Sequence, residues 1–89
     1  MSDNCKWHHL AALVDLYSQV HNKKIAGVLI SGGLYHGNEV VTYREMLTEF
    51  QIDNVSNIIR DECGHFWKYY CDDWYVYKHG CGWVKEARA

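Results

Sequence analysis

Apolar side chains recur at intervals of three and four residues near the start of the chain. Within residues 7–21 these positions are Trp7, Leu10, Ala11, Leu13, Val14, Tyr17 and Val20. The spacing predicts an α-helix with one wide apolar face, the pattern of a helix that packs against a core. Residues 22–24 are polar and include two lysines, which suit the negative end of a helix dipole. We therefore expect this helix to end near His21.

The next segment is weakly polar and rich in glycine. Residues 25–30 fit either a β-strand or a short buried helix, because periodicity does not separate the two in so short a run. Glycine-containing triplets at 31–33 and 36–38 predict turns. A short strand is expected at 39–41, where two valines follow a glutamate.

Two polar residues three positions apart mark the start of a second helix. Thr42 and Glu45 have the Thr-x-x-Glu form of a capping box. The predicted buried face of this helix consists of Tyr43, Met46, Leu47 and Phe50. Asp53 is then a candidate N-cap for a third helix over residues 54–69, which Gly64 weakens in its last turns. The helical spacing there rests on Val55, Ile58, Ile59, Glu62 and Phe66.

Aromatic residues dominate the last third of the chain. Eight of the thirteen aromatic residues lie between Phe66 and Trp83. Residues 74–78 are rich in strand formers, residues 79–82 contain two glycines, and residues 83–85 are suited to a partner strand. The sequence therefore predicts a C-terminal β-hairpin.

Composition limits the chain to one small domain. A length of 89 residues leaves no room for two cores, and 48% hydrophobic residues exclude a disordered chain. The formal net charge of −2 argues against nucleic-acid binding through bulk positive charge. The longest weakly polar stretch, residues 25–35, is shorter than the roughly 20 apolar residues that cross a bilayer. The first residues lack the pattern of a secretory signal, so we expect a cytoplasmic location and free cysteines.

The order of the predicted elements resembles that of the winged helix-turn-helix family. Residues 41–47 are similar to the first helix of the helix-turn-helix unit, residues 51–53 to its turn, residues 55–60 to the start of the recognition helix and residues 75–84 to the wing. The resemblance implies a small α+β, winged-helix-like domain over residues 1–89, with about three helices and a C-terminal β-hairpin. The glycine-rich segment at 25–38 departs from the family's pattern.

The resemblance also implies duplex DNA as a partner. In this family the recognition helix enters the major groove and the wing follows the backbone. Asparagine and arginine side chains suit the edges of adenine and guanine. The residues in the matching positions are Asn54, Ser56, Asn57 and Arg60 in the helix, and Lys78 and Lys85 in the wing. These positions favour a DNA-binding transcriptional regulator.

The charge of the same segment opposes DNA binding. Residues 39–62 contain six acidic residues against Arg44 and Arg60, a net charge of −4. Phosphate neutralisation supplies most sequence-independent affinity for DNA, so an acidic unit binds duplex weakly unless its carboxylates face away.

A protein-binding surface is the alternative interpretation, because aromatic residues are enriched at the energetic centre of protein interfaces. Alternation along residues 74–78 separates two aromatic sets, of which one is expected to be exposed. The candidate residues for this surface are Glu49, Asp61, Glu62, Trp74, Tyr75 and Tyr77. An acidic surface suits a nucleic-acid-binding host protein as partner, the mode of small phage-encoded inhibitors of host defence, including the anti-CRISPR class. A homodimer is a further possibility.

Metal binding and catalysis are not favoured by the spacing of the available residues. Cys63 and His65 stand at i and i+2 of the predicted helix and therefore point to nearly opposite sides. The weak candidates for a metal site are Cys63, Cys71, His79 and Cys81. The sequence contains no recognisable nucleophile motif or phosphate-binding loop. We therefore expect a non-enzymatic binding module without a cofactor and without a membrane partner.

Overall fold

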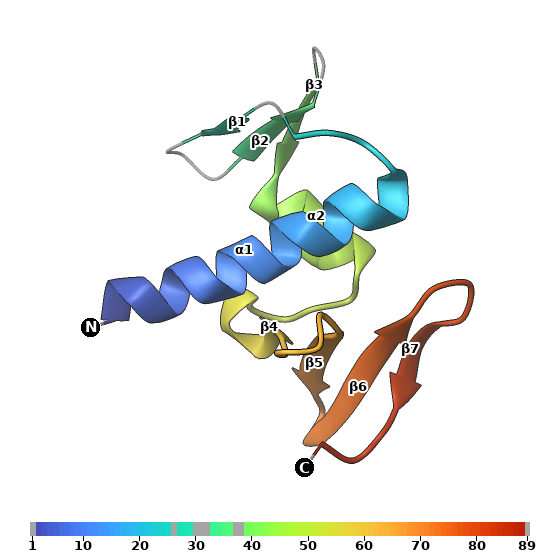
Figure 1. The fold of residues 1–89 in the computed structure, drawn as a ribbon. Helices are drawn as coiled ribbons and strands as arrows, with labels where there is room; N and C mark the ends of the chain where they lie inside the picture. The colour runs from blue at the N-terminus through green and yellow to red at the C-terminus, as the bar shows by residue number, and fades with distance from the viewer. Residues whose placement is uncertain (1, 26, 30–32, 37–38, 89) are drawn as a thin grey trace.

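A long helix separates two antiparallel sheets (Figure 1). The structure is a computed structural model that describes residues 2–25, 27–29, 33–36 and 39–88, with the backbone only for residues 2–6, 28, 29, 34 and 36. On one side of helix α1 (Ser2–His21) lies a sheet of three strands, which are β1 (Gly27–Leu29), β2 (Gly33–His36) and β3 (Glu39–Thr42). On the other side lies a sheet of four, which are β4 (Ile58–Arg60), β5 (Phe66–Tyr70), β6 (Asp73–Lys78) and β7 (Gly82–Lys85).

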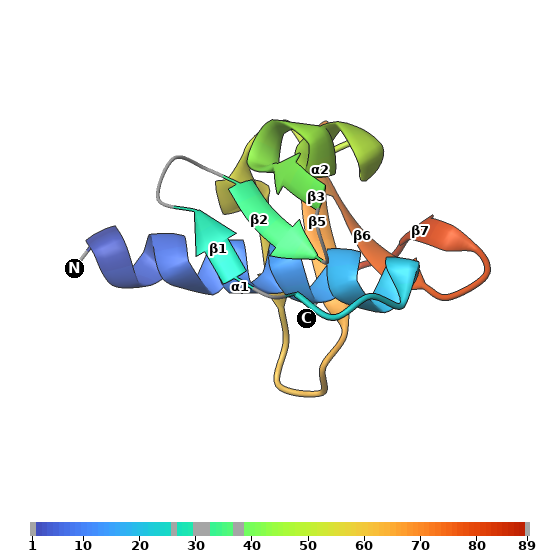
Figure 2. The same ribbon diagram turned by 90° about the horizontal axis from the view of Figure 1, so that it is seen from above.

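Two short elements join the sheets. Helix α2 (Tyr43–Glu49) follows β3 directly, and a single 3-10 turn, η1 (Val55–Asn57), precedes β4. Seen from above, β1 and β2 lie over the middle of α1, and α2 lies to one side of α1 (Figure 2). The expected capping box of α2 is confirmed: Thr42 Oγ1 accepts from the Glu45 N–H at 3.2 Å, and Glu45 Oε2 accepts from the Thr42 N–H at 3.0 Å.

The four-stranded sheet has two distinct faces. Its strands pair in chain order, and the register places Ile58 opposite Lys68 and Lys68 opposite Tyr75. Because side chains alternate along a strand, these residues share the inner face, which packs toward α1. The inner face includes Ile58, Phe66, Lys68, Tyr75, Tyr77 and Trp83, with Arg60, Tyr70, Asp73 and Lys85 toward its edges. The outer face includes Ile59, Trp67, Tyr69, Trp74, Val76, Lys78 and Val84.

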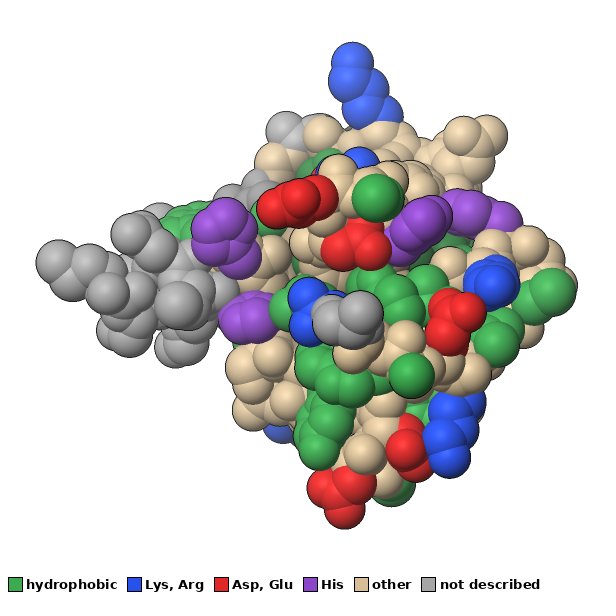
Figure 3. Space-filling model, turned by 60° about the horizontal axis from the view of Figure 1, so that its bottom comes forward, with side chains coloured by type: hydrophobic (Ala, Val, Ile, Leu, Met, Phe, Trp, Pro, Cys, Tyr) green, Lys and Arg blue, Asp and Glu red, His purple; other side chains and the backbone are tan. Residues whose placement is uncertain are grey.

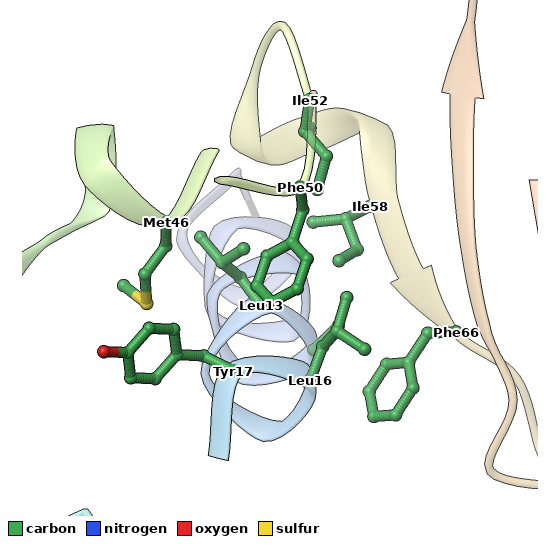
Figure 4. Close-up of a cluster of buried hydrophobic side chains, with 9 residues drawn as sticks. Leu13, Leu16, Tyr17, Met46, Phe50, Ile52, Ile58 and Phe66 are labelled. Atoms are coloured by element: carbon green, nitrogen blue, oxygen red, sulfur yellow. The ribbon is translucent and has the colours of Figure 1, made fainter. Parts of the chain in front are cut away.

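The core forms where α1 meets α2 and the inner face (Figure 4). Leu13 and Leu16 of α1, Met46 of α2 and Ile58 of β4 are fully buried. Burying an aliphatic side chain of this size stabilises a fold by about 1.5–3 kcal/mol. The rest of the buried cluster consists of Ala12, Tyr17, Phe50, Ile52 and Phe66.

The C-terminal end of α2 is bonded directly to the inner face. The Phe50 carbonyl oxygen accepts from Trp83 Nε1 at 2.8 Å and from Lys68 Nζ at 3.3 Å. Lys68 Nζ also donates to the Gln51 carbonyl oxygen at 2.9 Å. The last carbonyl groups of a helix carry partial negative charge, so a cation is favourable there. We call this set of bonds the α2–sheet junction.

Lys68 is a buried cation surrounded by aromatic rings. Its side chain is only 4% exposed, and its Nζ lies 4.8 Å from the ring centroid of Tyr70, 5.0 Å from that of Trp83 and 5.5 Å from that of Tyr75. Desolvation lowers the pKa of Lys68, and the Asp53 carboxylate acts in the opposite direction. The ring faces and the two carbonyl oxygens replace part of the hydration that the ammonium group loses.

The α+β class is confirmed, but the third helix predicted over residues 54–69 is wrong. In its place the chain forms η1, β4, a turn and β5, so the part of the chain that the structure describes holds two α-helices. The β-branched pair Ile58 and Ile59 and the aromatic run at 66–70 favour extended backbone. Gly64 adopts φ +86° in the intervening turn, a conformation that ends a right-handed helix. The helix that carries the winged-helix resemblance is therefore missing.

Other sequence predictions agree with the structure. Helix α1 ends at His21 as expected, although it begins earlier, at Ser2. Residues 27–29 form a strand, as does the predicted segment at 39–41, and the C-terminal hairpin is β6 and β7. The turns predicted at 31–33 and 36–38 lie largely outside the described residues.

The α2–sheet junction predicts that substituting Trp83 lowers the free energy of unfolding more than substituting Trp74 does. Trp83→Phe keeps a ring on the inner face but removes the N–H that bonds Phe50, so we expect a loss of about 1–2 kcal/mol in the free energy of unfolding. Trp74→Phe is the matched control, because Trp74 is also half-buried and its indole N–H has no partner in the described part of the chain. Urea unfolding followed by circular dichroism gives both values, and equal losses would contradict the importance of the Trp83 bond.

Candidate functional site

The polar residues expected in a recognition helix instead form the turn before β4. Asn54 Oδ1 accepts from the Ser56 N–H at 2.9 Å and from Ser56 Oγ at 3.0 Å. The Asn57 N–H donates to the Asn54 carbonyl oxygen, which closes the single 3-10 turn. Asn54, Ser56 and Asn57 therefore cap a turn and do not lie along one face of a helix.

Two of the three cations expected to contact DNA are paired with carboxylates. Arg60 Nη1 lies 3.0 Å from Asp15 Oδ2, which ties β4 to α1. Lys85 Nζ lies 3.3 Å from Asp73 Oδ2 on the neighbouring strand. Lys78, at the end of β6, makes no ion pair with any described residue. The structure thus does not gather these basic side chains on one surface.

The residues expected to bind a protein are also dispersed. Glu49 pairs with His21 and links the ends of the two helices. Tyr75 and Tyr77 are half-buried on the inner face, so they belong to the packed set of aromatic residues. Trp74 lies on the outer face, where its ring centroid is 5.1 Å from that of Tyr69.

Asp61 has a structural role that the sequence did not indicate. Its carboxylate accepts from the Cys63 N–H at 3.0 Å, the His65 N–H at 2.8 Å and Trp67 Nε1 at 2.9 Å. The Trp67 bond, together with the backbone donors and the nearby His65, lowers the pKa of Asp61 although partial burial opposes the shift. Asp61 therefore holds the β4–β5 turn, while its neighbour Glu62 is exposed.

The weak metal candidates do not converge. The β4–β5 and β6–β7 turns lie at one end of the sheet and the β5–β6 turn at the other, so Cys71 is separated from Cys63, His79 and Cys81. In the described ranges, no three His, Cys, Asp or Glu side chains are placed to hold a metal ion.

Among the side chains that the structure describes, the most exposed large apolar one borders a groove that the sequence did not indicate. Trp7 is 62% exposed and lies on α1 beside Leu10, Ala11 and Val14, which follow at helical intervals. These four residues form a second apolar stripe, next to the buried stripe that includes Leu13. The spacing of the apolar residues at 7–21 predicts a single wide face and does not distinguish the exposed stripe from the buried one.

Helix α2 and η1 form the other wall of this groove. Two adjoining cavities of about 370 and 240 Å³ share Leu10 and Tyr43. We call the combined site the α1–α2 groove. Its apolar lining consists of Trp7, Leu10, Ala11, Val14, Tyr43, Leu47 and Val55, and its polar lining of Asp15, Asp53 and Asn54.

The electrostatics of the α1–α2 groove are acidic. Asp15 and Asp53 contribute carboxylates, of which that of Asp15 also pairs with Arg60, and no Lys, Arg or His is among the described residues that line it. Burial raises the pKa of Tyr43, so its phenol stays protonated and neutral at physiological pH. The groove therefore offers apolar contact and negative charge, and its lining lacks the paired base and nucleophile of a catalytic site.

Comparison with protein-family models, curated proteins and solved structures gave no match. Within the described residues, no helix combines the length and apolar character needed to span a bilayer.

The Asp61 bonds predict a pH-dependent contribution to stability. Asp61→Asn removes the charged acceptor, so we expect a loss of about 1–2 kcal/mol in the free energy of unfolding near neutral pH. A carboxyl group whose pKa is lowered by folding stabilises the fold above its unfolded pKa and loses this contribution as pH falls through its folded value. Urea unfolding at neutral pH and at successive steps well below pH 3.8, the ordinary value for this carboxyl group, measures both effects, and a gap that stays constant over all the acid steps would contradict the prediction.

Proposed function

We propose that this chain is a non-enzymatic binding module that holds an amphipathic, basic segment of a protein partner in the α1–α2 groove. The observation that carries the proposal is the 62% exposure of Trp7 at the edge of an apolar groove. Tryptophan is among the residues most enriched at the energetic centre of interfaces, and contiguous exposed apolar surface marks interaction sites.

The spacing of the exposed stripe suits a helical segment. From Trp7 to Val14 the stripe spans about 10 Å of α1, at 1.5 Å per residue. Tyr43 and Leu47 stand one turn apart on the facing helix and line the same groove. An amphipathic helix that lies in a groove makes contacts of this kind through residues one turn apart.

Charge decides between the possible partners. Asp53 lines the groove and makes no ion pair with a described residue, and Asp15, which pairs with Arg60, lines it as well. A segment with lysine or arginine on its polar side therefore gains favourable contacts, chiefly with Asp53. A second copy of this chain would place the same carboxylates opposite each other, and a nucleic acid would place phosphates opposite them. Like charges repel, so both partners are disfavoured. A nucleic-acid-binding protein has basic segments of the required kind, which agrees with the protein partner expected from the sequence.

Synthetic helical peptides test the proposal directly. We expect the purified chain to bind a leucine–lysine amphipathic peptide about ten times more tightly than the same peptide with glutamate for lysine, because of the groove carboxylates. Trp7→Ala removes the main exposed contact and is expected to weaken the lysine peptide about 10- to 30-fold. Fluorescence anisotropy of labelled peptides measures both differences.

Tyr69→Ala is the matched control, since Tyr69 is 38% exposed on the outer face of the sheet, away from the groove. Equal effects of Trp7→Ala and Tyr69→Ala would refute the groove as the site. Two results would refute the proposed class of partner. One is salt-dependent binding of duplex DNA that is unchanged in Trp7→Ala. The other is a dimer, seen in sedimentation, that Trp7→Ala dissociates.

A further inference from the structure

The outer face of the four-stranded sheet contains a separate hollow. Figure 3 looks toward the lower side of Figure 1 and shows hydrophobic side chains in the middle, with acidic, basic and histidine side chains around them. A cavity of about 380 Å³ opens beside the sheet, and its lining includes Trp67, Val76, Lys78, His79 and Glu86. None of these residues lines the α1–α2 groove.

The floor of this hollow is apolar and fixed in position. Trp67 and Val76 are neighbours across β5 and β6, and they are 9% and 4% exposed. The Trp67 indole N–H is bonded to Asp61, so the ring is held in place. A flat apolar group that enters the hollow therefore meets a surface that needs little rearrangement.

The polar groups of the hollow lie at two ends. Lys78 ends β6 and His79 begins the following turn, so both stand at the hairpin end, where His65 also lines the hollow with its Nδ1 3.6 Å from Asp61 Oδ2. The Glu86 N–H donates to the Trp74 carbonyl oxygen at 3.1 Å, which places the Glu86 backbone at the opposite end. The side chains of Lys78 and Glu86 make no ion pair with described residues, so both are available to a ligand.

We infer that this hollow binds a small organic anion with one flat apolar group and one carboxylate or phosphate. The apolar group packs on Trp67 and Val76, and the anionic group points to Lys78 and His79, at the end where the Asp61 carboxylate is already bonded to three N–H donors, while Glu86 repels it from the other end. Small-molecule sites commonly combine an apolar surface with a few polar groups in a volume of about 300–1,000 Å³. A volume of about 380 Å³ fits a ligand of one ring with a short acidic substituent.

Titration of the full-length chain with defined compounds tests this site. The compounds are phenylacetate, phenyl phosphate, the neutral 2-phenylethanol and inorganic phosphate, and the readout is the NMR signal of the Trp67 indole N–H. We expect saturable shifts with the two ring-bearing anions and at least about fivefold weaker binding of the alcohol and of phosphate alone, since each lacks one of the two contacts. The stronger of the two anions identifies the acidic group that the site prefers.

Two lysine variants separate this site from general attraction of anions. Lys78→Gln is expected to weaken phenylacetate binding about fivefold or more, because it removes the cation at the hairpin end. Lys85→Gln is the matched control, since Lys85 pairs with Asp73 and is absent from the lining of the hollow. Equal effects of the two variants, equal binding of the neutral alcohol, or no saturable shift would each overturn the inference. Because the readout does not involve the α1–α2 groove, a negative result for this hollow would not bear on the proposed protein-binding function.

Discussion

The arrangement of this domain depends on how the short helix α2 is attached to the four-stranded sheet. Two side chains of the inner face, Lys68 and Trp83, donate to the carbonyl groups that end α2. These bonds satisfy helix-terminal acceptors that would otherwise lose water at a buried boundary. They also hold an ammonium group among aromatic rings, where its charge is favourable only if the carbonyl oxygens stay in place. The junction therefore holds the end of α2 against the inner face of the sheet.

That placement determines both candidate sites. With α2 held against the sheet, its Tyr43 and Leu47 lie across from the exposed stripe of α1 and form the second wall of the groove. The same attachment turns the inner face of the sheet toward the core and leaves the outer face, with Trp67 and Val76, for the hollow. Two surfaces of different chemistry thus result from one set of buried contacts.

The sequence was informative where the decisive contacts are local. The capping box, the end of α1 and the C-terminal hairpin follow from residues a few positions apart, and all three were predicted. The error at 54–69 arose because apolar residues there also fit helical spacing, whereas the pairing of Ile58 with Lys68 across the sheet is a long-range contact. Long-range packing likewise decides which apolar residues of α1 are covered, so the α1–α2 groove was not apparent from periodicity.

The division of α1 into two apolar stripes has an evolutionary consequence. Leu13 and Leu16 serve the core, whereas Trp7 is largely outside it. A substitution at Trp7 therefore alters the surface with little effect on the core, whereas Val14 of the same stripe packs partly against it. Trp7 and the core residues Leu13 and Leu16 thus stand on different sides of one helix, so the first can vary over evolution while the core stays constant.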